Sequence, residues 1–363
     1  MPKISVVCSS FNHEEYVLEF INSLMAQTVK DWELVIVDDC SADKTAEKIM
    51  SVKDKRIRFE EHKFNKGVNY GVSEATRLAK SDLVLFIGSD DMLCPDCLET
   101  VLKIFKENKD IVACYTPLRY IDENGKPTGK ILTLPRDKTE KEIFCDMFLG
   151  INRLPSPGLV FKKSALKPYL PLHYGLLQYS DYQIHLYLLY HHKIKMLEKP
   201  VVLYRKLKKG ASFRSHGLVV REDIETDALM DTIAVLIGND KASFLEYFGA
   251  NPLIENVKVE AKTVPYWLGR LALTSKYPAK QKWGLKKIMN FISNEENMAL
   301  LHKLYGFSFK DYLGLAKEVD PKHLTSAYWA KKYKKKIKKL KYIVAALGLC
   351  LAVCVAYIAF FKG

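Results

Sequence analysis

The chain of 363 residues is long enough for two domains, and its 48% hydrophobic content excludes a disordered or low-complexity protein. The formal net charge is +14, but eight of the positive charges are lysines between residues 331 and 341. The excess is therefore mostly local, and we expect no nucleic-acid partner. The eight cysteines show no disulfide-framework spacing, which fits a reduced cytosolic setting.

Short apolar strands alternate with amphipathic helices over residues 1–115. We expect strands at 4–8, 33–37, 56–62, 83–87 and 111–115. The intervening helices place these residues on their inward faces: Val17, Phe20, Ile21 and Leu24; Ala46, Ile49 and Met50; Ala75 and Ala79; Leu98, Val101, Leu102 and Phe105. This alternation predicts an α/β fold with a parallel, doubly wound sheet. The chain enters the first strand directly after Met1, Pro2 and Lys3, which is not typical of a signal peptide.

The run 83–87 has the composition of a strand buried on both faces, and it ends at Gly88. Ser89, Asp90 and Asp91 then lie beyond the carboxyl end of the strand, where open α/β sheets bind their ligands. Two adjacent carboxylates repel each other and need a cation or several hydrogen-bond donors. Asp90 and Asp91 therefore predict a site for a divalent metal, Mn²⁺ or Mg²⁺, and a diphosphate.

Cys94 and Cys97 have C-x-x-C spacing, typical of a redox pair or half of a zinc site. No second such pair completes a tetrahedral site. The alternative is the start of a helix with Pro95 at its first position.

The pattern loosens after residue 115. We expect a hairpin turn at 123–126, a break at 155–158, a helix over 183–191, a last strand at 200–205 and a mobile basic loop at 210–217. Beyond residue 218 the periodicity predicts only helices, at 223–237, 257–274, 282–292 and 298–304.

The C-terminal region joins a polybasic segment, 326–341, to twenty uncharged residues, 342–361. As a helix the uncharged segment would be about 30 Å long, the thickness of a bilayer's hydrocarbon core. We therefore expect a single-pass C-terminal transmembrane anchor rather than a buried core helix. By the positive-inside rule the lysines stay on the cytoplasmic face of the plasma membrane, against its anionic surface.

Six separated motifs follow one another in the first 215 residues: ISVVCSSFN, LMAQTVKDWELVIVDDCSADKT, NKG, LVLFIGSDDMLCPDCL, YSDYQ and LYRK. In this order and spacing the chain resembles the family 2 glycosyltransferases, inverting enzymes with the GT-A fold. The resemblance implies a GT-A domain at 1–215, with a nucleotide-sugar half at 1–115 and an acceptor half at 116–215. The helical domain at 216–325, the polybasic segment and the anchor lie outside it.

The resemblance also assigns a nucleoside pocket. The segment from Ser9 to Phe11 would cradle the nucleoside, and Phe11 would stack on the base without the hydroxyl of the family's usual tyrosine. Asp39 would hydrogen-bond the base beside its neighbour Asp38, and Gly67 of the NKG turn would join the same site. The alternative for the acid pair is a solvated turn in which Asp43 caps a helix.

Asp90 matches the family's metal ligand and Asp91 the acid after it. The first acid of the family's D-x-D pattern falls on Gly88, which predicts weaker metal affinity or a metal held mostly by the donor's phosphates.

Asp181 matches the family's catalytic base, although Ser180 replaces an acid often found before it. Such a base would remove the proton of the acceptor hydroxyl during a single, inverting displacement. The alternative for Asp181 is a helix N-cap. Arg205 would bind the nucleotide sugar near the loop that closes over the diphosphate, with Lys208, Lys209 and Arg214 beside it. The alternative for each of these cations is a solvated charge.

Together these features predict a membrane-anchored, metal-dependent, inverting hexosyltransferase. It would use a nucleotide-diphosphate sugar, for which we expect a UDP-sugar, and a membrane- or lipid-linked saccharide acceptor in cell-surface polysaccharide biosynthesis, such as capsule or lipooligosaccharide. The alternative is a catalytically silent, glycosyltransferase-like scaffold at the membrane. A homo-oligomer through the helical domain is possible in either case. A dinucleotide oxidoreductase is disfavoured because no G-x-G-x-x-G follows the first strand.

Overall fold

The computed structural model describes residues 1–150, 152, 154–177, 179–190, 192–207, 222–319, 334, 337 and 338. The loop expected at 210–217 and the anchor expected at 342–361 lie outside the described residues, as does nearly all of the polybasic segment. Across the described ranges, no helix is both long and apolar enough to cross a membrane. The chain divides into two compact units, Met1–Phe291 and Ile292–Gly363. The predicted boundaries at 215 and 325 stay predictions.

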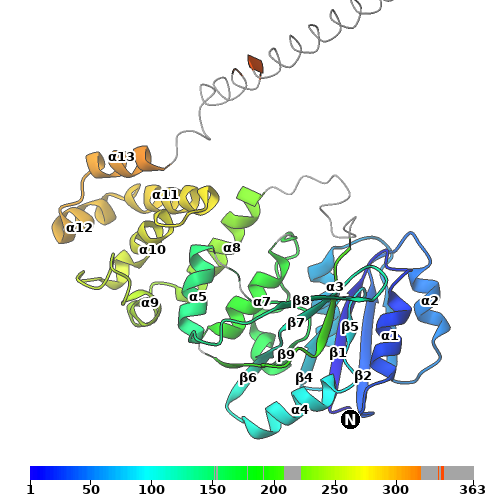
Figure 1. The fold of residues 1–363 in the computed structure, drawn as a ribbon. Helices are drawn as coiled ribbons and strands as arrows, with labels where there is room; N and C mark the ends of the chain where they lie inside the picture. The colour runs from blue at the N-terminus through cyan, green and yellow to red at the C-terminus, as the bar shows by residue number, and fades with distance from the viewer. Residues whose placement is uncertain are drawn as a thin grey trace, which may run out of the picture. The chain divides into compact units, whose positions relative to one another are not determined.

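A seven-stranded sheet in the order β10-β6-β9-β4-β1-β2-β3 forms the centre of the first unit (Figure 1). Its strands are β1 Ile4–Ser10, β2 Trp32–Asp38, β3 Ile57–Glu61, β4 Leu83–Phe86, β6 Ile111–Tyr115, β9 Leu159–Lys162 and β10 Lys193–Met196. Strand β9 runs antiparallel to β4 and β6, and the other neighbours are parallel. The sheet is therefore mixed. The five strands predicted over residues 1–115 run in one direction, as expected, but β9 lies between β4 and β6 and runs the other way, so the prediction of an all-parallel sheet was wrong. An apolar strand buried on both faces has the same sequence pattern in either direction.

The first four helices cover both faces of this sheet. They are α1 Val17–Met25, α2 Thr45–Ser51, α3 Val68–Leu78 and α4 Cys97–Glu107. Inward residues of α1 and α4 share one hydrophobic cluster with Ile4, Val6 and Cys8 of β1. Helix α3 packs on β1 and β2 without joining that cluster, so it covers the opposite face.

Two details near these helices differ from expectation. Met50 of α2 is 49% exposed, whereas the prediction placed it inward. Helix α4 begins at Cys97 with Asp96 as its N-cap, so Pro95 lies just before the helix and not at its first position. Cys97 is nonetheless fully buried in the core, and Cys94 and Cys97 are both free thiols. Cys97 is the first residue of α4, so the C-x-x-C pattern does lie at the start of a helix.

A smaller sheet has the order β5-β11-β7-β8, with β5 Met92–Leu93, β7 Leu118–Ile121, β8 Pro127–Leu132 and β11 Val202–Arg205. Strands β7 and β8 form the predicted hairpin, and Gly125 in its turn has φ of 77°. Strand β11 pairs antiparallel with β5, which directly follows Asp90 and Asp91. This pairing brings Arg205 to the acidic turn.

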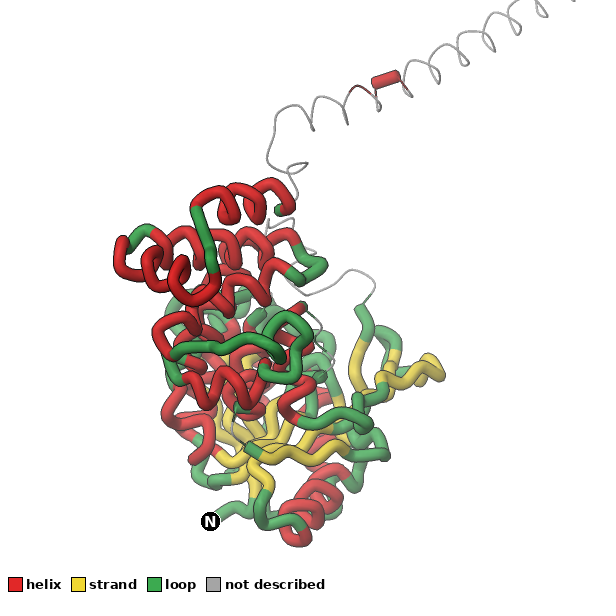
Figure 2. Tube along the Cα trace, turned by 90° about the vertical axis from the view of Figure 1, so that its left-hand side faces the viewer, coloured by secondary structure: helices red, strands yellow, loops and turns green. Residues whose placement is uncertain are grey.

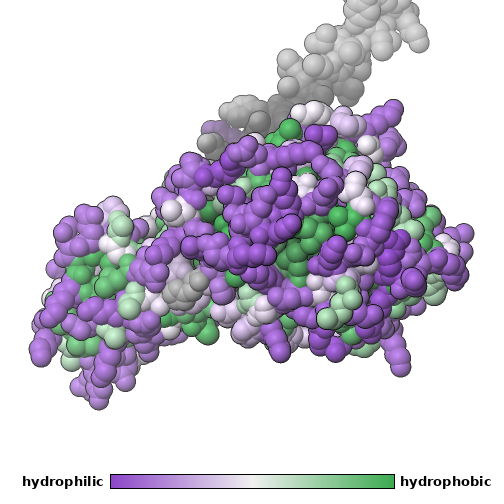
Figure 3. All heavy atoms as spheres, turned by 90° about the horizontal axis from the view of Figure 1, so that it is seen from below, coloured by the Kyte–Doolittle hydropathy of each residue, from purple (hydrophilic) through white to green (hydrophobic). Residues whose placement is uncertain are grey.

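The rest of the first unit is helical (Figure 2). It contains α5 Glu140–Leu149, α6 Lys163–Leu166, η1 Lys167–Tyr169, α7 Ser180–Leu189, α8 Glu222–Ile237, α9 Lys241–Phe248, η3 Ala261–Thr263, α10 Val264–Leu273 and α11 Pro278–Ile292. Helices α10 and α11 touch backbone to backbone: a Cβ added at Gly284 would lie 2.5 Å from the carbonyl oxygen of Gly269. The second unit contains α12 Glu295–Tyr305 and α13 Phe309–Glu318. Hydrophilic side chains dominate the face shown in Figure 3, with apolar side chains in smaller patches.

Candidate functional site

Polar residues gather where β1, β2, β3 and β4 end. The amide of Asp39 donates to the carbonyl of Ser10 (2.8 Å), and the hydroxyl of Ser89 donates to the hydroxyl of Ser10 (3.1 Å). His13 Nδ1 lies 2.7 Å from the same Ser89 hydroxyl. The next residues include Asn12 (φ 53°) and Cys40 (φ 62°), left-handed conformations that non-glycine residues rarely adopt. Such outliers concentrate at functional sites, so they support a binding edge here.

Asp39 organises the turn that precedes α3. Its carboxylate accepts the amides of Lys66 (2.7 Å) and Gly67 (2.8 Å), and it contacts His62 Nδ1 at 2.7 Å. Gly67 has φ of 90°, which disfavours a side chain at this position. The structure therefore brings Asp39 and Gly67 together as predicted, while a hydrogen bond from Asp39 to a nucleobase stays a prediction.

The other residues of the predicted nucleoside pocket lie at the same edge. Ser9 faces α3 so closely that a Cβ at Gly71 would come within 2.3 Å of the Ser9 hydroxyl. Asp38 is buried and accepts both the amide (2.8 Å) and the hydroxyl (2.6 Å) of Ser41. Burial raises the pKa of Asp38, and the Ser41 hydrogen bonds oppose this shift. Phe11 lies half-buried just past the end of β1.

The two acids after β4 have different surroundings. Asp91 is buried and accepts the backbone N–H of Arg205 at 2.9 Å. Burial raises the pKa of Asp91 well above its usual value, and the negative charge of Asp90 raises it further. Asp90 is only half-buried, which leaves it the more accessible of the two. A Cβ at Gly88 would lie 2.7 Å from Asp90 Oδ1 and 3.3 Å from Asp91 Oδ2, so position 88 adjoins both carboxylates.

These residues fit a cation in a limited way. Asp91 is committed to Arg205, Gly88 supplies no ligand, and Asp90 remains as one accessible carboxylate. Mg²⁺ and Mn²⁺ sites are often built from one or two carboxylates together with substrate phosphates. Asp90 therefore suits a cation that arrives with a diphosphate, and not a site made by the protein alone.

Arg205 has a different place from the one expected. Its side chain is fully buried, and its guanidinium contacts Glu19 at 2.6 Å. It also donates to the carbonyl oxygens of Asp90 (2.8 Å) and Glu123 (2.7 Å). Arg205 thus holds the Asp90–Asp91 turn from inside. The expectation of an exposed or solvated cation was wrong, because strand β11 carries its last residue beneath the turn.

Asp181 lies in the first turn of α7, after Tyr179 as the N-cap residue, so the N-cap interpretation of Asp181 was wrong. The hydroxyl of Ser156 donates to Asp181 Oδ2 at 2.5 Å. The Asp181 side chain remains 35% exposed and can be reached from solvent.

The residue behind Asp181 was missed as a part of the site. His185 is fully buried, and its Nδ1 lies 3.0 Å from the hydroxyl of Tyr115. Its Nε2 has no hydrogen-bond partner among the residues that the structure describes, and it lies 4.0 Å from Asp181 Oδ2. Burial lowers the pKa of His185, and the charge of Asp181 opposes this shift. The signal was available in the sequence, because residues four apart face the same side of a helix.

The hydroxyl of Tyr204, on β11, is influenced by both acidic groups. Its pKa is raised first by burial and then by the charges of Asp91, Asp90 and Asp181. All three carboxylates therefore lie within electrostatic reach of one hydroxyl. The predicted base is thus near the predicted metal and diphosphate residues, although about ninety residues separate them in the sequence.

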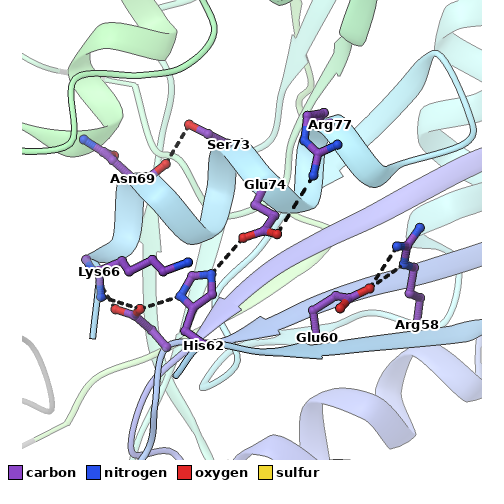
Figure 4. A network of polar contacts seen from close by, with 10 residues as sticks. Arg58, Glu60, His62, Lys66, Asn69, Ser73, Glu74 and Arg77 are labelled. Carbon is purple, nitrogen blue, oxygen red and sulfur yellow. Dashed lines mark hydrogen bonds and ion pairs between the residues drawn. The ribbon is translucent and has the colours of Figure 1, made fainter. Parts of the chain in front are cut away.

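A second histidine missed in the sequence joins the nucleoside side to α3. His62 follows β3, and its Nδ1 contacts Asp39 while its Nε2 lies 2.8 Å from Glu74 Oε2 (Figure 4). Its ring is buried and packs edge-on against Tyr70 at 5.2 Å. His62 directly follows β3 as Asp39 directly follows β2, so the rule that selected the acids could have found it.

The chain matches the family described as "Glycosyl transferase family 2" over residues 5–169. It is 30% identical over 212 residues to "Uncharacterized glycosyltransferase MJ1057" of Methanocaldococcus jannaschii, covering 56% of this chain and 71% of that protein. The chain therefore belongs to glycosyl transferase family 2.

Two bacterial relatives share shorter regions with it. "Putative teichuronic acid biosynthesis glycosyltransferase TuaG" of Bacillus subtilis is 28% identical over 151 residues, 41% of this chain and 60% of TuaG. Chondroitin synthase of Escherichia coli is 29% identical over 153 residues, but the match spans only 22% of that enzyme.

Among solved structures, S. aureus TarS 1–349 in complex with UDP-GlcNAc superposes with a TM-score of 0.54 at 19% identity, covering 82% of this chain and 83% of that one. This likeness shows a shared fold. A GT-A-like mixed-sheet domain followed by a helical region is thus confirmed.

Proposed function

We propose that the protein transfers a sugar from a nucleotide-diphosphate sugar to a saccharide acceptor in cell-surface polysaccharide biosynthesis. The observation that carries the proposal is the position of Asp181, accessible to solvent and within reach of the same Tyr204 hydroxyl as Asp90 and Asp91. The name of TuaG supports a surface polysaccharide as the product. The UDP-GlcNAc bound to TarS supports a UDP-sugar as the donor.

Asp181 is the general base in this proposal. Its carboxylate takes the proton of the acceptor hydroxyl while that oxygen forms a bond to the anomeric carbon. The bond from the anomeric carbon to the diphosphate oxygen breaks on the opposite side, and the electron pair leaves with the nucleoside diphosphate. Such a single displacement inverts the anomeric centre. Ser156 orients the carboxylate by donating a hydrogen bond to Asp181 Oδ2.

Asp90 would hold a divalent cation that arrives with the donor. When bound, that cation supplies positive charge where the leaving diphosphate becomes more negative. Arg205 supports this arrangement from within, because it fixes the backbone of the acidic turn. Asp39 and Gly67 would hold the nucleoside side of the donor, with Phe11 stacked on the base.

We also propose that residues 342–361 anchor the protein in the plasma membrane with its catalytic unit in the cytoplasm. The sequence supports this with an uncharged stretch of bilayer length after a lysine-rich segment. The acceptor would then be lipid-linked. Self-association through the helical region is a further possibility under this proposal.

A panel of UDP-sugars tests the catalytic proposal, with purified protein, Mn²⁺ and detection of released UDP. We expect one donor to be turned over by the wild type, and Asp181→Asn to reduce the rate by about 10²–10⁴-fold. Asp110→Asn is the matched control, since Asp110 is an exposed acid paired with Lys193. Equal rates in the wild type and both variants would overturn the proposal.

The catalytically silent scaffold remains as a second candidate, because two residues favour it. Gly88 and Ser180 stand where the family pattern has acids. This candidate predicts that UDP-sugars bind without turnover and that Asp181→Asn leaves their affinity unchanged.

A further inference from the structure

A cavity of about 610 Å³ lies along the outer side of α3, between that helix and the segment from α6 to Tyr174. Its volume falls within the range of small-ligand sites. Ser9, Phe11, Asp39, Asp90 and Asp181 do not line it, so it is separate from the candidate site described above. We name it the α3 groove.

The walls of the α3 groove are fixed to each other by polar contacts. The amide of Leu172 donates to the hydroxyl of Ser73 (3.2 Å), and the side-chain amide of Asn69 donates to the carbonyl of His173 (2.8 Å). Figure 4 shows Asn69 and Ser73 together on α3, with Glu74 and Arg77 further along the same helix. The groove is therefore built by tertiary contacts, and is not a gap beside a detached loop.

The lining of the α3 groove is positively charged. Arg77, Lys163 and Lys167 line it with one carboxylate, Glu74, which leaves a formal excess of two positive charges. The Arg77 side chain is 69% exposed, and its contact with Glu74 is long, at 4.0 Å. Glu74 makes a shorter contact of 2.8 Å with His62, so Arg77 can still bind a ligand. Arginine and lysine heads in this setting bind phosphate and carboxylate oxygens.

Two tyrosines give the groove an aromatic end. The rings of Tyr70 and Tyr174 lie 4.8 Å apart with an angle of 43° between their planes, and Tyr174 is 43% exposed. The Lys66 ammonium lies 4.2 Å from the centre of the Tyr70 ring and adds positive charge there. Tyrosine presents an apolar ring face beside a hydroxyl, which suits the alternating C–H and O–H groups of a sugar.

The lining is also extended. Tyr70 and Arg77 are seven residues apart on α3, a separation of about 10 Å along the helix. Aromatic rings at one end and cations at the other suit a chain-like ligand with sugar rings and repeated negative charges. The two tilted tyrosine rings do not form the parallel slot that would sandwich a flat base.

We propose that the α3 groove binds an anionic saccharide, with sugar rings on Tyr70 and Tyr174 and carboxylate or phosphate groups on Arg77, Lys163 and Lys167. The proposed function gives this binding its role, which is to hold part of the acceptor away from the reacting end. The binding itself does not depend on transfer and can be measured without it.

Calorimetric titration of the full-length protein in detergent tests the proposal with defined probes. The carboxylate probe is tetragalacturonic acid, the phosphate probe is maltotetraose phosphorylated on its sugar hydroxyls, and the neutral probe is maltotetraose. We expect at least one anionic probe to bind at least tenfold more tightly than maltotetraose. Whichever anionic probe binds more tightly identifies the charge the groove prefers. Equal affinity for all three probes would overturn the proposal.

Variants then locate the binding. We expect the double variant Arg77→Glu, Lys167→Glu to lower the affinity for the anionic probe at least tenfold. The control Lys193→Glu should leave this affinity unchanged, since Lys193 lies on β10 and outside the groove. Tyr174→Ala should lower the affinity as well.

We expect binding to persist in Asp90→Ala and in the presence of saturating UDP. Loss in either case would place the ligand in the donor site and overturn the proposal. If the wild type binds the probe but turns over no UDP-sugar, the proposed function is refuted while the proposal that the α3 groove binds an anionic saccharide is retained.

Discussion

Gly88→Asp should place a second carboxylate beside the accessible carboxylate of Asp90. The new Cβ would lie 2.7 Å from Asp90 Oδ1, so the Asp90 side chain must turn and the two carboxylates would be about 4 Å apart. Two like charges at that distance repel by about 4 kcal/mol in a medium of effective dielectric 20. Because Asp90 is half-exposed, we take about half of this, roughly 2 kcal/mol, as the loss of stability without a cation.

The assay is thermal unfolding of the wild type, Gly88→Asp and the uncharged, similarly sized Gly88→Asn, each with EDTA and with Mn²⁺. The entropy of unfolding of the unit Met1–Phe291 is about 0.6 kcal/mol/K, so a loss of about 2 kcal/mol lowers Tm by about 3 °C. Mn²⁺ at about a hundred times its Kd stabilises a protein that binds it only when folded by about 2.7 kcal/mol. The Tm of Gly88→Asp should therefore be about 3 °C lower in EDTA and recover with Mn²⁺.

Gly88→Asn separates charge from shape, because its side chain meets the same neighbours without the repulsion. We expect it to be indifferent to Mn²⁺. If Gly88→Asp and Gly88→Asn unfold at the same temperature in EDTA, and Mn²⁺ raises neither, then position 88 does not adjoin a cation site and the reasoning fails.

Three further predictions concern other parts of the fold. Ser156→Ala removes the hydrogen bond to Asp181 and should lower kcat about tenfold with little change in the KM for the donor. Steady-state kinetics measures both constants, and an unchanged kcat would show that Ser156 does not orient Asp181. Burial lowers the pKa of Lys280 to about 7, so between pH 7 and 10.5 the unfolded chain keeps a proton that the folded chain has lost. The free energy of unfolding should therefore rise with pH through that window, by up to about 5 kcal/mol. In urea unfolding, Lys280→Met should lose this rise, and Lys282→Met, which changes a more exposed lysine, should keep it. Gly284→Ala should destabilise the protein by about 1–3 kcal/mol in urea unfolding, because the added methyl meets the backbone of α10; equal midpoints would show that the two helices separate freely.

The carboxyl edge of the main sheet was predictable because apolar runs and polar ends mark it directly. Strands β1 and β2 are buried along almost their whole length and end at Ser10 and Asp38, and β4 ends at Phe86, shortly before Ser89. Parallel strands place such ends side by side, so Ser10, Asp38 and Ser89 meet as expected. Their proximity follows from the alternation of strands and helices along the sequence, which requires no knowledge of the tertiary structure.

The direction of β9 and the existence of β10 were not predictable in the same way. Strand β10 is KIKM, an edge strand whose two lysines interrupt any apolar run. Strand β9 is apolar, but nothing in its composition says which way it runs. Both depend on the neighbours that the rest of the chain provides.

The place of Arg205 shows a further limit. The residue type predicted a cation near a diphosphate, but the pairing of β11 with β5 decides whether its side chain points outward or beneath the acidic turn. More than a hundred residues separate Asp91 from Arg205, so the sequence does not show how β11 pairs with β5. His185 differs, since its four-residue offset from Asp181 is visible once α7 is predicted.

His62 touches a donor-side carboxylate with one ring nitrogen and a groove-side carboxylate with the other. An anionic ligand that binds Arg77 competes with Glu74 for it, so Glu74 would shift toward His62 and change the hydrogen bond that His62 makes with Asp39. Asp39 in turn holds the turn at Lys66 and Gly67. Thermodynamic reciprocity then applies: if an occupant of the groove alters the affinity for a nucleotide sugar, the nucleotide sugar alters the affinity of the groove by the same factor. One buried imidazole would thus couple the two binding sites, with one coupling free energy whichever substrate binds first.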